Sequence, residues 1–148
     1  MELGFFDDTQ DFVFYGQTGR GKTHLAIAIG NACIQNGLEV RFFTFAQLVL
    51  RLVKTKHEEK LEALYKDLSR AKLVILDEFG YVPLDIEGAR LSFQVITDCY
   101  ERRSLIITTN IEFGKWGTVF GDDKLAAAVI NRWFVMEGSL SPTERAKE

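Results

Sequence analysis

The sequence has few prolines, no long apolar run and no basic start. It contains two prolines in 148 residues, and its apolar and charged fractions, 47% and 26%, are close to the average for globular chains. No apolar run approaches the roughly 18 residues needed to cross a bilayer. Glu2, Asp7 and Asp8 stand where a secretory signal would be basic. We therefore expect a cytoplasmic protein that is ordered except at its ends.

Cysteine is scarce, and positive charge is slightly outnumbered by negative charge. Cys33 and Cys99 form no Cys-x-x-Cys pair and have no histidine nearby, which argues against both a zinc site and a disulfide framework. We expect both to be small buried apolar residues. The formal net charge of −3 argues against a protein that coats nucleic acid by overall charge, but it does not exclude a local basic patch. The sequence has no internal repeat and no low-complexity segment.

What the sequence does contain is an alternation of short apolar strands with amphipathic helices. Strands are predicted at 12–15, 40–44, 72–76 and 104–109, and helices from 22 to a stop at 36–37, twice within 46–69, at 89–100 and at 124–131. This alternation predicts an α/β domain over residues 1–138, with a parallel sheet, helices on both faces and right-handed crossovers. Residues 139–148 are predicted to form a polar, disordered tail. The apolar spacing also predicts which helix residues face the core, namely Leu25, Ala28, Ile29, Ala32, Cys33, Leu61, Leu64, Tyr65, Leu68, Leu91, Val95, Ile96 and Cys99.

A complete phosphate-binding motif lies between the first predicted strand and helix. Residues 16–23 match the Walker A pattern G-x-x-x-x-G-K-[ST]. Glycines allow backbone N–H groups to surround phosphate oxygens, Lys22 can reach the β and γ phosphates, and the Thr23 hydroxyl can bind Mg²⁺. The alternative, a glycine-rich turn that only caps a helix, does not require this full pattern. The predicted phosphate-binding residues are Gly16, Gln17, Thr18, Gly19, Arg20, Gly21, Lys22 and Thr23.

Two acids follow the third predicted strand, and an amide follows the fourth. Asp77 is predicted to hold Mg²⁺ as the Walker B aspartate, and Glu78 to accept a proton from a water aligned on the γ-phosphate. Asn110 could orient that water or a phosphate oxygen. Taken alone, the acids could begin a solvated loop, and the asparagine could simply start a turn. The complete phosphate loop upstream favours the catalytic interpretation for the acids.

A longer set of segments resembles a known family. Besides the phosphate loop, the segments that carry this resemblance are residues 24–26, 40–44, 76–84, 100–104, 107–110, 116–117, 120–122 and 125–128. Their order and spacing resemble the IstB-type ATP-binding proteins of insertion sequences over about residues 12–132. The DnaC-type helicase loaders share the same AAA+ core. The expected fold is therefore a P-loop NTPase of AAA+ type.

The resemblance implies functional roles for several residues. It adds His24 to the nucleotide site, makes Asn110 the first sensor, and makes Arg132 an arginine finger that reaches the nucleotide of a neighbouring subunit. The family's Asp-Arg pair reads Asn131-Arg132 here. A finger supplied by a neighbour requires a homo-oligomer for turnover. The implied activity is hydrolysis of ATP·Mg²⁺ in an oligomer around DNA that assists a transposase or loads a replicative helicase.

The resemblance also has departures. Family members carry a partner-contacting segment before the position of Phe12 and a second sensor arginine beyond that of Arg132. Neither is evident here, and Arg145 stands in a different context. We therefore expect a sequence shortened at both ends. Two alternatives remain open: a nucleotide-binding fragment with little turnover, and a small-molecule kinase, which would not need Glu78 and should have an arginine-rich lid.

The segment after the second predicted strand is a candidate DNA surface. Residues 40–57 contain basic side chains and no acid. Residues 46–56 resemble the extra helix with which related initiator and loader ATPases grip DNA, and the predicted phosphate contacts are Arg51, Lys54 and Lys56. Such binding would be independent of sequence and sensitive to salt. The alternative is an ordinary solvated helix face.

Overall fold

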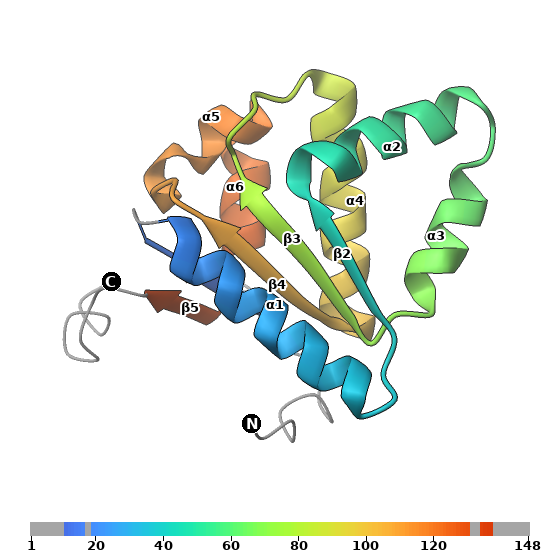
Figure 1. Ribbon diagram of the computed structural model, residues 1–148. Helices are drawn as coiled ribbons and strands as arrows, with labels where there is room; N and C mark the ends of the chain where they lie inside the picture. Colours follow the sequence, from blue (N-terminus) through green and yellow to red (C-terminus); the bar gives the residue numbers. More distant parts are fainter. Residues whose placement is uncertain (1–10, 17–18, 131–133, 138–148) are drawn as a thin grey trace.

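The fold is built on a five-stranded parallel sheet with the strand order β2-β3-β4-β1-β5 (Figure 1). The computed structural model describes residues 11–16, 19–130 and 134–137. The strands are β1 (Asp11–Tyr15), β2 (Val40–Thr44), β3 (Leu73–Phe79), β4 (Ser104–Thr109) and β5 (Phe134–Glu137). The predicted parallel sheet is confirmed, and β5 adds an edge strand that the sequence did not predict. The predicted tail 139–148 lies outside the described residues.

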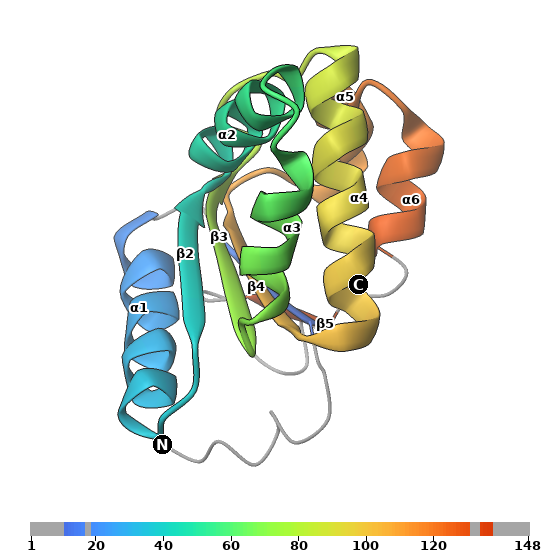
Figure 2. The same ribbon diagram turned by 90° about the vertical axis from the view of Figure 1, so that its right-hand side faces the viewer.

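Helices cover both faces of the sheet, but unequally. The helices are α1 (Gly19–Gln35), α2 (Phe45–His57), α3 (Leu61–Ser69), α4 (Ile86–Arg102), α5 (Trp116–Phe120) and α6 (Asp123–Ile130), with a 3₁₀ turn at Phe113–Lys115. Among the described helices, α1 lies by itself on one face, whereas α2, α3, α4 and α6 lie on the other (Figure 2). None of the helices within the described ranges is long and apolar enough to span a membrane.

Alternation along the strands produces two apolar cores. On β3, Leu73 and Ile75 face α1, while Val74 and Leu76 face the helices of the opposite layer. All four side chains are buried, because a central parallel strand is covered on both faces. The ends of this strand are therefore held rigidly, which matters for the acids that it carries.

The predicted inner face of α1 is partly wrong. Ala26, Ile29 and Cys33 are buried, but Leu25 is 44% exposed and Ala28 is also exposed. A single helix lying on a sheet buries only a narrow stripe, and residues about 100° away from it remain in solvent. The helix approaches the sheet closely, since a Cβ at Gly30 would lie 3.1 Å from Cδ1 of Ile75.

The predictions for the opposite layer are confirmed. Leu91, Val95, Ile96 and Cys99 of α4 are all buried, because this helix packs against the sheet and also against α2, α5 and α6. On α3, Leu64 and Leu68 are buried, and Leu61 and Tyr65 pack against the same core. Here a wide apolar face is needed, and the spacing in the sequence indicates that face correctly.

An aromatic cluster joins the end of β3 to the neighbouring helices. The ring of Phe79 lies 4.7 Å from that of Phe45, 4.2 Å from that of Trp116 and 5.5 Å from that of Phe120, between centroids. The indole N–H of fully buried Trp116 donates to the Ile111 carbonyl over 3.0 Å. The cluster therefore fixes both the end of β3 and the loop that follows β4.

Candidate nucleotide-binding site

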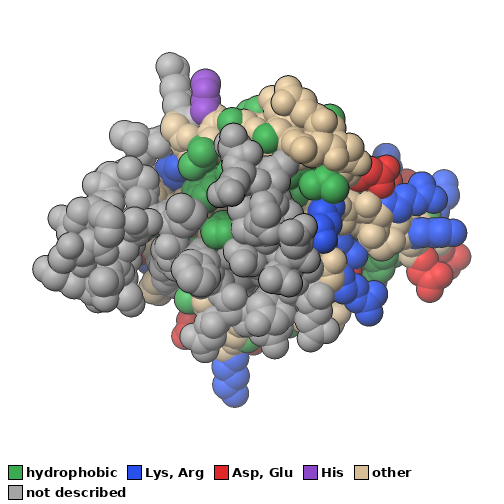
Figure 3. Space-filling view, turned by 90° about the horizontal axis from the view of Figure 1, so that it is seen from below, with side chains coloured by type: hydrophobic (Ala, Val, Ile, Leu, Met, Phe, Trp, Pro, Cys, Tyr) green, Lys and Arg blue, Asp and Glu red, His purple; other side chains and the backbone are tan. Residues whose placement is uncertain are grey.

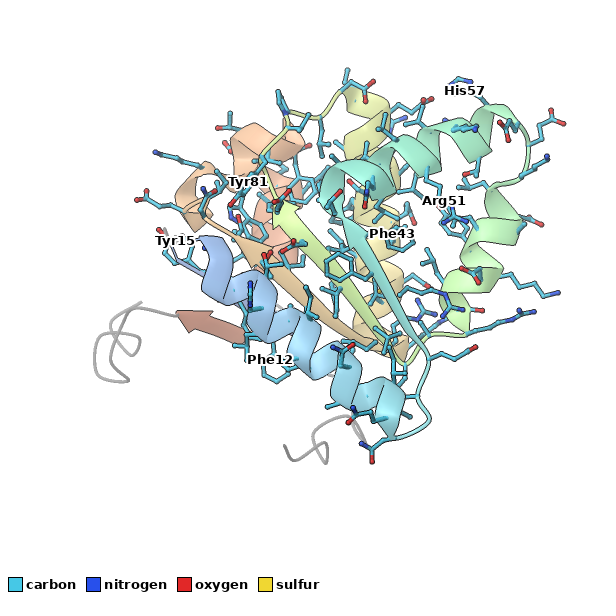
Figure 4. All side chains as sticks on the ribbon, viewed as in Figure 1. Phe12, Tyr15, Phe43, Arg51, His57 and Tyr81 are labelled. Atoms are coloured by element: carbon cyan, nitrogen blue, oxygen red, sulfur yellow. The ribbon has the colours of Figure 1, made fainter. Side chains whose placement is uncertain are left out.

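The predicted nucleotide residues gather at the carboxyl ends of β1, β3 and β4, which are neighbours in the sheet. The Gly16 amide donates to the Thr109 carbonyl over 3.3 Å, which joins the start of the phosphate loop to the end of β4. Tyr15 and Tyr81, labelled in Figure 4, lie at this edge. Ligands of open parallel sheets bind at the carboxyl edge.

The described part of the phosphate loop places Lys22 in the interior. Its side chain is buried and its ammonium group donates to the Gly16 carbonyl. Burial lowers the pKa of Lys22 from its ordinary value, and the nearby Asp77 carboxylate partly opposes this shift. A buried ammonium group at the start of a helix favours an anionic ligand.

The structure describes some of the remaining predicted loop residues but not all of them. Gly19, Arg20 and Gly21 belong to the first turn of α1, and His24 is exposed one turn later. Gln17 and Thr18 lie outside the described residues. The role of each in nucleotide binding stays a prediction.

Thr23 and Asp77 meet at the site. The Thr23 hydroxyl donates to Oδ1 of Asp77 over 2.9 Å. Two neighbouring ligands of an octahedral Mg²⁺ lie about 3 Å apart, so these two oxygens fit that ion. Within the described ranges, no group of three or more His, Cys, Asp or Glu side chains could hold a metal. The fit therefore depends on nucleotide phosphates and water as the other ligands.

Glu78 occupies an irregular position in β3. The pairing with β4 shifts register between Leu76 and Phe79, and Glu78 has a φ of 60°. A left-handed backbone conformation is uncommon for a non-glycine residue and persists only where the surroundings impose it. At this shift the Glu78 side chain is exposed to solvent, whereas its neighbours Asp77 and Phe79 are buried. The sequence predicted that β3 would stop at Leu76, but it continues through both acids to Phe79.

The pKa of Tyr81 is affected by the negative charge at this edge of the sheet. Burial raises the pKa of the Tyr81 phenol, and the carboxylates of Glu78 and Asp77 raise it further. Both acids therefore influence this phenol. Asn110 is exposed directly after β4, where the sequence predicted it. Arg132, the predicted finger, lies outside the described residues.

In the folded protein, acidic side chains from other helices lie close to the basic residues of the candidate DNA segment. Arg41 forms two hydrogen bonds, of 3.2 and 3.1 Å, with the carboxylate of Asp67 on α3, which lowers the pKa of Asp67. Lys56 lies 3.2 Å from Glu87 on α4. The stretch without acids at 40–57 therefore meets acids from other helices.

Arg51 and Lys54 are the more available cations of α2. The guanidinium carbon of Arg51 lies 5.9 Å from the centroid of the Phe43 ring, beside it in Figure 4. Lys54 is 76% exposed, with Glu58 4.0 Å away. Figure 3 shows acidic and basic side chains mixed at the right, over the side where α3 lies in Figure 1. Binding of DNA through α2 stays a prediction.

Comparison with known proteins identifies the family. Residues 1–137 match the family described as IstB-like ATP binding protein. The chain belongs to this family. This IstB-like chain is 43% identical over 132 residues to the ATP-binding protein of insertion sequence IS232 from Bacillus thuringiensis subsp. berliner, covering 89% of the chain and 53% of that protein. It spans about half the length of the curated relatives it matches. The resemblance predicted from the sequence is confirmed.

Solved structures establish the fold of this IstB-like chain. It is similar to the DnaC helicase loader, with a TM-score of 0.78 and 24% identity over 91% of this chain and 81% of that one. It is also similar to the replication initiator DnaA bound to AMPPCP and single-stranded DNA, with a TM-score of 0.79 and 19% identity over 93% and 43%. The predicted AAA+ P-loop fold is confirmed.

Thr108 of this IstB-like chain is a further residue beside the site that was not predicted from the sequence. Its hydroxyl donates to Oδ1 of Asp77 and accepts from the Glu78 amide over 3.0 Å. The signal available in the sequence was a pair of threonines at the end of an otherwise aliphatic strand. Their position beside the acids depends on the pairing of β3 with β4, in which Leu76 lies opposite Ile107. That register was not predicted.

Proposed function

We propose that this chain is the ATPase part of a transposition helper, binding and hydrolysing ATP·Mg²⁺ within a DNA-bound homo-oligomer. The observation that carries the proposal is the meeting of Thr23 and Asp77 beside buried Lys22, with Glu78 next along the strand. Membership of a family of ATP-binding proteins supports the nucleotide. The relative from IS232 is about twice as long as the part that this chain matches. The partner of the complete protein is therefore also a proposal.

The proposed chemistry assigns one task to each group. Lys22 and the backbone of residues 16–23 hold the phosphates, while Thr23 and Asp77 bind Mg²⁺, which supplies charge neutralisation at the phosphate oxygens. Glu78 accepts a proton from the attacking water, and Asn110 orients that water or a γ-phosphate oxygen. An exposed carboxylate beside a buried one suits this division, because a base must reach water and a metal ligand must stay fixed.

Assembly completes the proposed site. Arg132 would extend from one subunit to the γ-phosphate held by the next and neutralise charge that builds up during transfer. Arg51, Lys54 and Lys56 of each subunit would contact DNA phosphates, so that weak contacts add up in the oligomer. The partner in the complete protein would be a transposase, and work on bacterial DNA would place the protein in the cytoplasm. A helicase-loader core is the alternative with the same chemistry.

A steady-state ATPase assay with and without duplex DNA tests the proposal. Mg²⁺-dependent release of phosphate that increases with DNA is the expected result, and Lys22→Ala should abolish it. ATP binding without turnover would identify a nucleotide-binding fragment. Phosphate transfer that requires a small acceptor would indicate a kinase. Stimulation by a replicative helicase, but not by a transposase, would favour the loader alternative.

A further inference from the structure

We propose that Thr108 is a positioning residue that holds the backbone of Glu78 in its catalytic conformation; the inference rests on the proposed hydrolysis. The Thr108 side chain on β4 contacts both acids of β3. Its hydroxyl donates to Oδ1 of Asp77 and accepts from the backbone amide of Glu78 over 3.0 Å. One buried hydroxyl therefore joins the metal ligand to the base.

The need for such a residue follows from the shape of β3. Glu78 has a φ of 60°, where the regular pairing with β4 is interrupted, so the sheet ladder does not hold this peptide in the usual way. A left-handed glutamate requires contacts that outweigh its backbone strain. The hydrogen bond from the Glu78 amide to Thr108 is such a contact, and it lies in the interior because Thr108 is 2% exposed.

The neighbouring threonine has a different task. The hydroxyl of Thr109 donates to the Phe79 carbonyl over 2.8 Å and accepts from the Ile111 amide over 3.0 Å. It therefore anchors the peptide beyond the base and the loop after β4. Of the two threonines, Thr108 is the one bonded to Asp77 and to the Glu78 amide.

The geometry separates binding from turnover. Asp77 also accepts from Thr23, so it keeps one hydroxyl donor when the Thr108 hydroxyl is lost. The Glu78 amide, by contrast, would lose its Thr108 acceptor, and its peptide could rotate toward a more relaxed conformation. The effect should fall on the base and not on nucleotide affinity.

The test compares Thr108→Val, which keeps shape but removes the hydroxyl, with Thr108→Ser, which restores it. For Thr108→Val we expect kcat to fall about 10- to 100-fold, with the ATP Kd within about threefold of the original protein. Thr108→Ser should recover kcat to within about threefold. Thr97→Val is the matched control, because the Thr97 hydroxyl bonds to Phe93 within α4, away from the site.

A second measurement does not depend on turnover. Hydrogen exchange of the Glu78 amide, followed by NMR in the nucleotide-free protein, should become about tenfold faster in Thr108→Val and return toward the original rate in Thr108→Ser. The inference would be overturned if Thr108→Val kept both the amide exchange rate and the kcat of the original protein. It would also be overturned if the kcat of Thr108→Ser were as low as that of Thr108→Val. If the original protein hydrolyses no ATP, the proposed function fails and the positioning role fails with it. Altered exchange would then establish only a structural hydrogen bond.

Discussion

Thr23 on α1 donates a 2.9 Å hydrogen bond to Asp77 on β3, although 54 residues separate them in the chain. The bond joins the helix that follows the phosphate loop to the strand that carries both acids. Because β3 is buried on both faces and α1 lies against it, neither partner can move far without disturbing a core. The site is therefore preorganised by packing, and substitutions can separate its binding and catalytic functions.

Lys22→Ala is expected to abolish ATP binding while the domain remains folded. The change removes the ammonium group that faces the expected β and γ phosphates, together with its bond to the Gly16 carbonyl. Isothermal titration gives the affinity, and circular dichroism checks the fold. Lys66→Ala, a change of an exposed residue on α3, is the control and should bind ATP normally. Unchanged affinity in Lys22→Ala would refute the phosphate-loop interpretation.

Glu78→Gln should retain ATP binding and lose at least about 100-fold in turnover, because an amide keeps the shape of the carboxylate but cannot take up the proton. Single-turnover hydrolysis separates the chemical step from nucleotide binding. Glu62→Gln, an exposed change in the first turn of α3, should hydrolyse ATP at the original rate. Equal rates for Glu78→Gln and the original protein would remove Glu78 from the mechanism.

Arg132→Ala should lower ATP turnover only when the protein is assembled into an oligomer. Mixed with Lys22→Ala protein, it is expected to recover part of the turnover that each variant lacks, because one supplies an intact pocket and the other an intact finger. Phosphate release is measured across mixing ratios, with assembly checked by sedimentation. Assembled mixtures that stay inactive at every ratio would contradict a finger supplied by a neighbour.

The parts of the fold that follow from local pattern could be predicted, and those that depend on pairing could not. Residues 40–44 and 104–109 coincide with β2 and β4, because a short β-branched or aromatic run between turns is a local property. The exposed Leu25 was mispredicted because its exposure depends on how many elements cover α1. Thr108 was missed because only the register of β3 against β4 brings it to the acids. Motif spacing singled out Lys22, Thr23 and Asp77, which the structure brings together, whereas the acids that face α2 could be recognised only in the folded structure.

The triple change Arg51→Ala, Lys54→Ala, Lys56→Ala should weaken DNA binding equally for unrelated duplexes and leave ATP affinity unchanged. Each lost phosphate contact should reduce the slope of log affinity against log salt by about 0.9. Fluorescence anisotropy over a salt series on two duplexes measures this. An unaltered slope would mean that any bound DNA contacts another surface.

Glu87→Gln provides a control of opposite sign for the same surface. Lys56 and His57 both bond to Glu87 and hold its pKa below the usual value. Neutralising the acid frees Lys56, so DNA affinity should rise if Lys56 contacts phosphate. A fall in affinity with Glu87→Gln would exclude that role for Lys56.

Trp116→Phe should lower the free energy of unfolding by about 1–3 kcal/mol. The change removes the donor to the partly buried Ile111 carbonyl and leaves a gap beside Phe79. Urea unfolding followed by circular dichroism measures the loss. Thr118→Ala, exposed on the same helix, should change stability by less than about 0.5 kcal/mol. Equal stabilities for Trp116→Phe and the original protein would contradict the structural importance of the cluster.

The position of α1 has an evolutionary consequence. Of the described helices, it alone covers its face of the sheet, and its first turn belongs to the phosphate loop. A substitution at Ala26, Ile29 or Cys33 therefore changes the seating of the loop as well as the core beneath it. Selection for nucleotide use would therefore act on these apolar residues as well as selection for stability, even though they would touch no ligand.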